Sequence, residues 1–183
     1  MNASPALVLV DVLNGFFNPD GSLWYPEVVE VVDPLHQLLD TARERERLVV
    51  HVADRHRPGV YDAEFEVIPE HLFSGGFESE FFEGFEPSPG EPVVEKRRYS
   101  GFFATDLALV LHESGIRTVI VAGVKTNVCI RATVTDGSAH GFRVVVPRQA
   151  TNSNRPHLAA ASLEDMERYL ALVKDLDEAL EEL

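Results

Sequence analysis

The sequence contains a single cysteine and no long hydrophobic run among its 183 residues. One cysteine cannot form an intrachain disulfide, so nothing indicates an oxidising compartment. A stretch of about 18 apolar residues, which a membrane-spanning helix needs, is absent, and no basic-then-apolar leader opens the chain. We therefore expect a cytoplasmic protein that neither spans nor binds a membrane.

Basic residues are also scarce. The chain has 16 Lys and Arg against 30 Asp and Glu, which gives a net charge of −14. A surface this acidic repels phosphate backbones, so nucleic acid is not an expected partner. The composition is otherwise typical of globular proteins, at 45% hydrophobic and 25% charged residues. The length favours one domain over residues 1–183.

Short apolar runs alternate with amphipathic segments along the chain. Helices are predicted at 26–47, with a kink or break at Pro34, and at 105–114, 127–140 and 156–183, the last with room for one break. Strands are predicted at 6–12, 48–53, 92–95, 118–122 and 143–146. This alternation indicates βαβ units. The expected fold class is therefore α/β, a three-layer α/β/α sandwich with a mostly parallel sheet.

The segment 57–92 departs from this regular pattern. It holds six of the eleven phenylalanines, and residues 58–95 contain ten acids but no Lys or Arg. A long irregular segment inside a compact domain is usually a lid, a binding loop or an interface. Its aromatic residues either pin the loop to the core or form a pocket wall, and the sequence leaves both open. We interpret 57–92 as a lid or pocket loop.

Cys129 is the first candidate for chemistry. It follows the predicted strand 118–122 and is expected in the first turn of the next helix. Unpaired backbone N–H groups and the helix dipole favour a thiolate there, and the same donors can stabilise an oxyanion. A lone cysteine also fits a small buried hydrophobic residue.

Asp11 and Lys96 are the partners that Cys129 would need. Asp11 ends a buried strand, where a carboxylate must be paired or solvated, and it can serve as a general base. Lys96 follows the predicted strand 92–95, and an ammonium near a thiolate and a carboxylate stabilises both charged forms. The carboxyl ends of parallel strands meet at one edge of a sheet, which is where sites in such folds lie.

Three stretches of this chain resemble sequence motifs of one family, and they occur in the same order as in that family. They are ALVLVDVLNGFFNPDGSL with Asp11, PGEPVVEKRRYSGFFATDL with Lys96, and GIRTVIVAGVKTNVCIRATVTDGSAHGFRVVV with Cys129. On these motifs the chain is identified as a member of the isochorismatase-like cysteine hydrolases, which include nicotinamidases and ureide amidohydrolases. The resemblance covers residues 6–155.

The resemblance implies a mechanism. Asp11 takes the proton of Cys129, the thiolate attacks a carbonyl carbon, and Lys96 stabilises the resulting charge pair. The backbone N–H groups of Lys125 and Cys129 form the oxyanion hole, and the peptide between Val124 and Lys125 is cis. This covalent chemistry requires no cofactor.

A metal site is suggested by Asp54, His56 and His71. The first two lie just past the predicted strand 48–53. A carboxylate with two imidazoles suits a divalent ion that keeps open positions. Nicotinamidases carry a similar Asp-x-His and a later His. This resemblance implies a bound Zn, Fe or Mn ion that holds the ring nitrogen of the substrate. Arg55 departs from the Trp of many nicotinamidases, and ureide-cleaving members keep similar loops without metal, so hydrogen-bonded loop histidines are the alternative.

The predicted function is that of a cysteine-dependent amidohydrolase that releases ammonia from a small amide through a thioester. A neutral planar amide such as nicotinamide is the first substrate hypothesis, and a ureide or N-carbamoyl compound is the second. An isochorismatase-type hydrolase and a non-catalytic binding module of the same fold stay open, although a dianionic vinyl ether suits the acidic lid poorly. The resemblance also implies a homo-oligomer, either a dimer or a tetramer.

Overall fold

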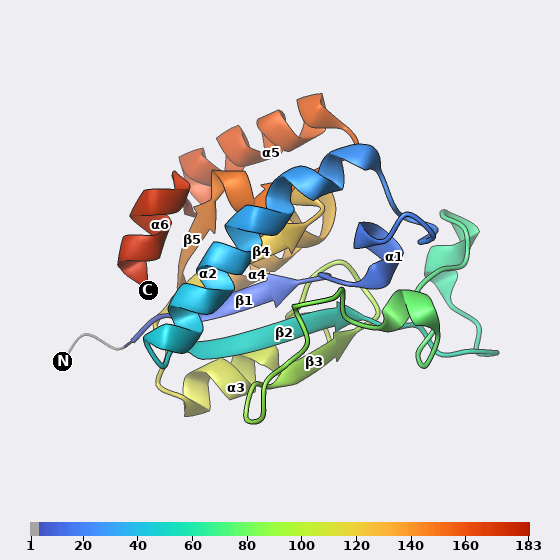
Figure 1. Ribbon diagram of the computed structural model, residues 1–183, viewed down its shortest axis with the longest axis horizontal. Coiled ribbons are helices and arrows are strands. Elements are labelled where there is room, and N and C mark those ends of the chain that lie inside the picture. Colours follow the sequence, from blue (N-terminus) through green and yellow to red (C-terminus); the bar gives the residue numbers. More distant parts are fainter. Residues whose placement is uncertain (1–3) are drawn as a thin grey trace.

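A seven-stranded sheet forms the centre of the computed structural model, which describes residues 4–183 (Figure 1). The strand order is β3-β2-β1-β4-β5-β7, β6 lies beside β4, and these pairs are parallel. The strands are β1 (Ala6–Val10), β2 (Leu48–Asp54), β3 (Val93–Lys96), β4 (Thr118–Val124), β5 (Arg143–Pro147), β6 (Thr151–Asn152) and β7 (Leu172–Lys174).

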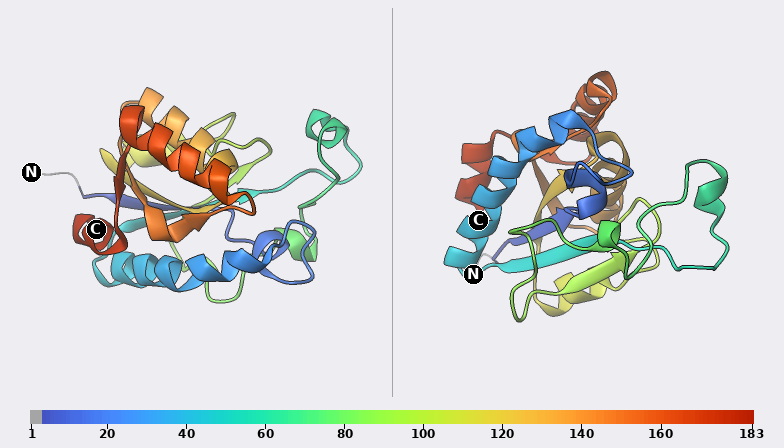
Figure 2. Two further views of the ribbon diagram at one scale, coloured as in Figure 1. Left: turned by 90° about the horizontal axis from the view of Figure 1, so that it is seen from above. Right: turned by 45° about the vertical axis from the view of Figure 1, so that its right-hand side comes forward.

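Helices cover both faces of this sheet (Figure 2). One face packs against α2 (Val32–Glu44) and α6 (Leu176–Glu182), and the other against α3 (Leu107–Glu113), α4 (Arg131–Ala139) and α5 (Pro156–Tyr169). Along β1, Leu7 and Leu9 enter the first core while Val8 and Val10 enter the second. Burial on both faces explains why β1 reads as a continuous apolar run. The predicted three-layer α/β/α sandwich is confirmed.

The helices predicted at 26–47 and at 127–140 differ in detail from the observed ones. A 3-10 helix at Pro26–Val31 precedes α2, so the predicted break falls just before Pro34, which lies in the first turn of α2. The helix predicted at 127–140 begins instead as a π-helical turn, Thr126–Ile130, and continues as α4. Short helical pieces, α1 (Asn14–Phe17), Ala63–Glu66, Phe77–Ser79 and Arg148–Ala150, complete the chain.

The helix predicted from 156 to the end, with room for one break, is interrupted once, but the interruption is a strand that was not predicted. Strand β7 interrupts it between α5 and α6, and β6 was also missed. Val173 pairs with Val146 of β5, which lies 27 positions earlier (173 − 146). A strand of three residues carries no readable periodicity, and its pairing depends on a distant part of the chain.

Within residues 4–183, no helix combines the length and the apolarity that crossing a membrane requires.

Candidate active site

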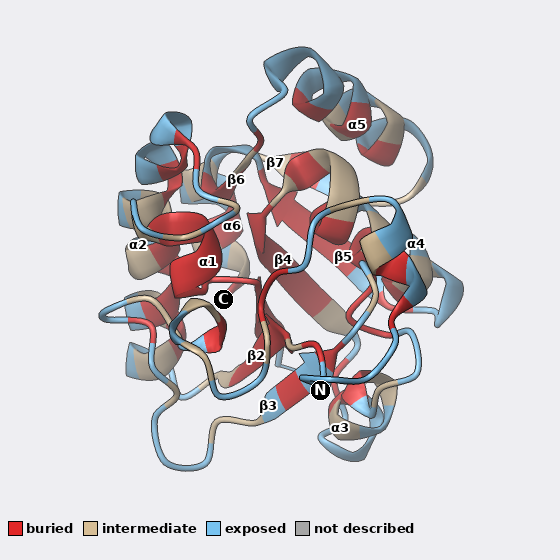
Figure 3. Cartoon of the chain, turned by 90° about the vertical axis from the view of Figure 1, so that its right-hand side faces the viewer, coloured by how far each residue is buried: buried red, intermediate tan, exposed pale blue. Residues whose placement is uncertain are grey.

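Four titratable side chains meet at the carboxyl edge of the sheet, the side that Figure 3 views. Asp11 follows β1, Asp54 ends β2, Lys96 ends β3, and Cys129 lies in the π-helical turn after β4. All four are buried. The parallel register places Asp54 directly beside Lys96. The predicted convergence of Asp11, Lys96 and Cys129 at this edge is what the structure shows.

The backbone bends sharply where Asp11 and the β4 turn approach each other. Asp11 has a φ of 58°, in a region that few residues other than glycine adopt and that Asp tolerates better than most. Gly123 has a φ of 123°, and a Cβ there would lie 2.0 Å from the carbonyl oxygen of Val10. Only glycine fits that approach of β4 to β1. The next peptide, between Val124 and Lys125, is cis, as expected.

The Lys96 ammonium is the centre of the cluster. Its Nζ lies 3.0 Å from Asp11 Oδ2, 3.2 Å from Asp54 Oδ2 and 3.5 Å from Cys129 Sγ. The backbone N–H of Asp54 donates to Asp11 Oδ1 at 3.0 Å, which fixes the orientation of that carboxylate. Lys96 is therefore held by both carboxylates and the sulfur at once.

Burial and charge set the proton affinities in this cluster. Burial raises the pKa of Asp11 to about 6, partly opposed by Lys96 and reinforced by Asp54. Burial also raises the pKa of the Cys129 thiol well above its usual value, with Lys96 opposing and the two carboxylates reinforcing the shift. Although burial alone disfavours its charge, Lys96 has a raised pKa because Asp11, Cys129 and Asp54 surround it. The resting site therefore holds a neutral thiol, a charged lysine and a carboxylate that is a stronger base than ordinary Asp.

Beside this cluster lies a second group that includes the three predicted metal ligands. Asp54, His56, Glu64 and His71 are all buried, and one ligand atom from each lies within 4.8 Å of the others. His56 Nε2 is 3.3 Å from Asp54 Oδ1, and His71 Nε2 is 3.8 Å from Glu64 Oε1. Asp54 belongs to both groups, because its other oxygen contacts Lys96.

The donor atoms of this second group fit a divalent ion. Within the described chain, Asp54 Oδ1, His56 Nε2 and Glu64 Oε1 are buried without a hydrogen-bond partner, an expensive arrangement unless something binds them. His71 Nδ1 is 2.7 Å from the carbonyl oxygen of Pro69, which must accept, so a neutral His71 carries its lone pair on Nε2. His56 Nδ1 is 3.0 Å from Asp62 Oδ2. Such outer contacts orient ligand imidazoles in metal sites.

Sequence reasoning missed Glu64 and Asp62. Both lie in the acidic segment 57–92, where nothing along the chain distinguishes them from the eight other acids of 58–95. Asp62 begins the short helix Ala63–Glu66 and accepts from the backbone N–H of Glu64. Burial alone would raise the pKa of Asp62. The pKa is nevertheless lowered to about 2, because the carboxylate accepts the backbone N–H of Glu64 and contacts His56 and Arg98. Their burial, which only the folded chain reveals, is the signal that identifies them.

A cavity of about 240 Å³ opens onto Cys129. Polar or charged groups from Asp54, Glu64, His71 and Lys125 face it together with the thiol. The rest of its wall is mainly apolar, formed by Phe16, Leu23, Ile68, Pro69, Tyr99 and Val128. A space of this size accommodates a small molecule whose carbonyl carbon can reach the sulfur.

The sequence left two roles open for the phenylalanines of 57–92, packing of the loop and formation of a pocket wall, and for the cavity at Cys129 the structure favours packing. None of its six phenylalanines lines this cavity as the described residues form it; its contribution comes from Glu64, Ile68, Pro69 and His71. Phe85 is fully buried in the core against His36, and Phe82 packs on it. Phe65 packs instead on the imidazoles of His56 and His71, with ring centroids 4.6 and 5.5 Å away. Its role is to hold those rings in place.

Among residues 4–183, Lys125 is the one Lys or Arg side chain that lines this cavity. Its Nζ lies 5.1 Å from the ring centroid of Tyr25 and 5.9 Å from that of Phe16. Burial lowers its pKa, Cys129 opposes that shift, and the positive charge of Arg155 adds to it. Within residues 4–183 no carboxylate forms an ion pair with it. The cavity therefore contains a cation with room for an anionic partner.

Comparison with known proteins places this arrangement in a family. The family model "Isochorismatase domain" matches residues 5–178. Maleamate amidohydrolase of Pseudomonas putida is 35% identical over 98% of this chain and 86% of its own length.

Solved structures agree with this result. An isochorismatase-like hydrolase from Alkaliphilus metalliredigens superposes with a TM-score of 0.91 at 34% identity, covering 98% of both chains. The pyrazinamidase of Pyrococcus horikoshii, solved in complex with zinc, gives a TM-score of 0.85 at 27% identity, covering 94% of this chain and 99% of that one.

Proposed function

The chain belongs to the isochorismatase family, and we propose that it cleaves a small amide through Cys129 and releases ammonia. It is a hydrolase of non-peptide C–N bonds, the class to which maleamate amidohydrolase belongs. The main support for the cysteine mechanism is that one buried ammonium, that of Lys96, contacts both Asp11 and Cys129. A purely structural cysteine has no need of a buried base and cation beside it.

The reaction begins with a proton transfer. Asp11, a stronger base than ordinary Asp, takes the proton of Cys129 and becomes neutral, and the Lys96 ammonium then stabilises the negative charge on the sulfur. The sulfur attacks the amide carbon, and the backbone N–H groups of Lys125 and Cys129 stabilise the oxyanion. The C–N bond breaks as Asp11 returns the proton to nitrogen, which leaves as ammonia. A water molecule, deprotonated by Asp11, then hydrolyses the thioester to a carboxylic acid.

The first substrate class we propose is a small amide that also carries one carboxylate. Lys125 supports it, because this half-buried cation has no carboxylate partner in the described part of the chain and therefore attracts an anionic group of the ligand. The relation to maleamate amidohydrolase supports the same class. The cavity of about 240 Å³ limits such a substrate to a few carbon atoms or one small ring.

The second substrate class is a neutral planar amide of the nicotinamide type, which sequence reasoning ranked first. The four-residue cluster of Asp54, His56, Glu64 and His71 supports this class. A divalent ion held by these residues would bind a lone pair of the substrate, such as a ring nitrogen, and orient the amide toward Cys129.

Measurement of ammonia and pyruvate release from a panel of substrates tests these proposals. The panel comprises maleamate, nicotinamide, pyrazinamide, biuret, an N-carbamoyl amino acid and isochorismate. We expect ammonia from at least one amide, with maleamate the best substrate, and no pyruvate from isochorismate. Nicotinamide turnover above that of maleamate would favour the second class. Pyruvate release without ammonia from any amide would contradict the amidohydrolase proposal.

The metal proposal predicts about one Zn, Fe or Mn per purified chain. We expect His56→Ala to lose that metal, because it removes a buried ligand whose other nitrogen is held by Asp62. The matched control is His157→Ala, an exposed histidine outside the cluster, which should keep the wild-type metal content. Elemental analysis gives the stoichiometry, and chelation should raise KM. Chelated, metal-free protein with unchanged KM and kcat would contradict a role for the ion.

A further inference from the structure

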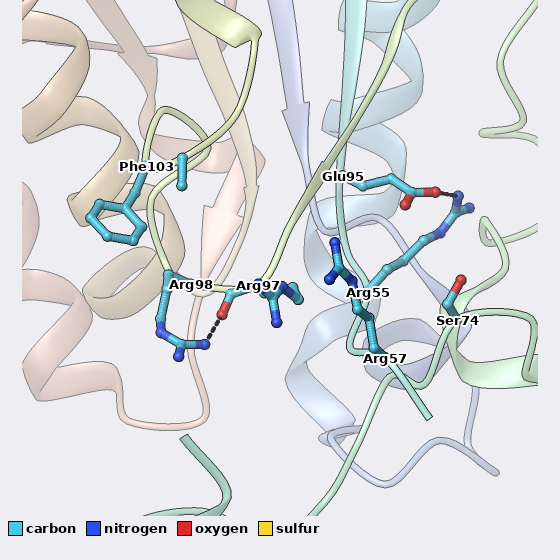
Figure 4. A pocket seen from close by; sticks show the side chains of 8 residues that line it. Arg55, Arg57, Ser74, Glu95, Arg97, Arg98 and Phe103 are labelled. Atoms are coloured by element: carbon cyan, nitrogen blue, oxygen red, sulfur yellow. Dashed lines mark hydrogen bonds and ion pairs between the residues drawn. The ribbon is translucent and has the colours of Figure 1, made fainter. Parts of the chain in front are cut away.

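A second cavity, of about 380 Å³, is lined by four arginines (Figure 4). Arg55 and Arg57 follow β2, and Arg97 and Arg98 follow β3. The remaining lining residues are Ser74, Glu95, Phe103 and Ala104. Four of the 16 basic residues of a chain with a net charge of −14 therefore gather around one hollow.

Chain geometry explains why these arginines gather there. Side chains of an extended segment alternate between its two sides. After β2, Asp54 and His56 are buried in the site already described, whereas Arg55 and Arg57 are more exposed and face the second cavity. After β3, Lys96 is buried in the site and Arg97 faces the cavity. The two cavities share no lining residue.

The carboxylates nearby do not neutralise this cavity. Glu95 pairs with Arg55 at 2.7 Å. Asp62 accepts from Arg98 at 2.8 Å and is also shared with His56. Arg97 only reaches Asp62 at 4.0 Å. No ion pair of Arg57 occurs among the residues that the structure describes.

The arrangement in Figure 4 leaves two guanidinium groups available to a ligand. Arg57 and Arg97 lie between the Arg55–Glu95 pair and Arg98. Arg98 also donates to the backbone carbonyl of Arg97, which holds that side chain at the rim. Neighbouring like charges without a counter-charge are unfavourable by themselves, and a bound anion relieves their repulsion.

We propose that this cavity binds a small multivalent oxyanion, a ligand with a phosphate group or with two or more carboxylates. Planar guanidinium groups bind phosphate and carboxylate oxygens in pairs, and Arg is favoured where such groups are recognised. The cavity is larger than the amide site, so the oxyanion can belong to a larger molecule. This second site does not depend on the chemistry proposed for Cys129.

Calorimetric titration with inorganic phosphate and, separately, with citrate tests the proposal. Ionic strength is held constant with chloride, so that general screening does not differ between samples. We expect saturable binding of one anion per chain to the wild-type protein. The two arms distinguish a phosphate ligand from a polycarboxylate, and tighter binding of either one supports the proposal.

A double variant and a matched control identify the binding site. Arg57→Gln with Arg97→Gln should weaken binding by at least about tenfold, since each substitution removes a charge and the charge-assisted hydrogen bonds that it makes to the anion. Arg117→Gln with Arg168→Gln changes the net charge equally at exposed positions outside the cavity and should bind like wild type. Equal weakening in both variants, or no saturable binding of either anion to wild type, would overturn the proposal. Amide hydrolysis by the pocket variant is measured separately, so a failure here is distinct from a failure of the amidohydrolase assignment.

Discussion

Cys129→Ala should abolish amide hydrolysis, with kcat reduced by roughly 10⁴–10⁶-fold, the range seen when a covalent nucleophile is removed. The thiol is buried, touches Lys96 and faces the cavity of about 240 Å³, and it belongs to the single cysteine of the sequence. Cys129→Ser, which preserves the size of the side chain, should be similarly inactive, because a hydroxyl is far less acidic than a thiol. Ammonia release by purified, folded protein is the measurement.

The single cysteine makes the covalent step directly observable. Because Cys129 is the only thiol of the chain, an acyl adduct detected on intact protein during turnover identifies the site without peptide mapping. Its mass should equal that of the substrate minus ammonia. Iodoacetamide should label the same residue in step with loss of activity. Wild-type turnover by Cys129→Ala would refute the nucleophile assignment.

Asp11→Asn should lower kcat/KM by about 10³-fold, within the 10²–10⁴-fold range typical of general bases. The thiol pKa lies well above its usual value, so proton removal by Asp11 is needed before attack. In wild type the working form of Asp11 is deprotonated. Its pKa is raised to about 6, so kcat/KM should fall as the pH drops through about 6 and level off above it.

The pH profile separates a base from a merely structural carboxylate. In Asp11→Asn the residual activity should lack the acid limb near pH 6, because the titrating group is gone. Asp106→Asn makes the same chemical change at an exposed position before α3 and should keep both the rate and the limb. Near-normal kinetics in Asp11→Asn, or an unchanged acid limb, would contradict the assignment.

The strands and the ends of several helices were predictable because their causes are local. The run Thr118 to Ala122 is apolar and β-branched, as a strand buried on both faces must be, and β4 contains it. Gly115, with a φ of 70°, follows α3 where sequence reasoning placed its end. By contrast, β7 exists because Val173 reaches β5, and no local pattern encodes that contact.

The site was predictable to the extent that its residues are rare or stand at strand ends. Cys129 is unique, and Asp11 and Lys96 interrupt or end apolar runs. Glu64 was not predictable, because it is one of ten acids in residues 58–95. The roles of the phenylalanines in 57–92 stayed open for the same reason, since a phenylalanine that fills the core, such as Phe85, has the same local sequence signal as one that lines a cavity.

The sequence by itself determined the layered α/β fold, the set of chemical groups and their order along the chain, since these follow from short-range patterns and side-chain identity. Only the tertiary structure decided how those groups behave. Asp54 joins the Lys96 cluster to the histidines through its two oxygens, and Asp11 gains a pKa of about 6 from burial. Lys125 has no carboxylate partner among residues 4–183. These properties depend on burial and on contacts between residues far apart in the chain. Desolvation and charge pairing arise only when such residues are brought together.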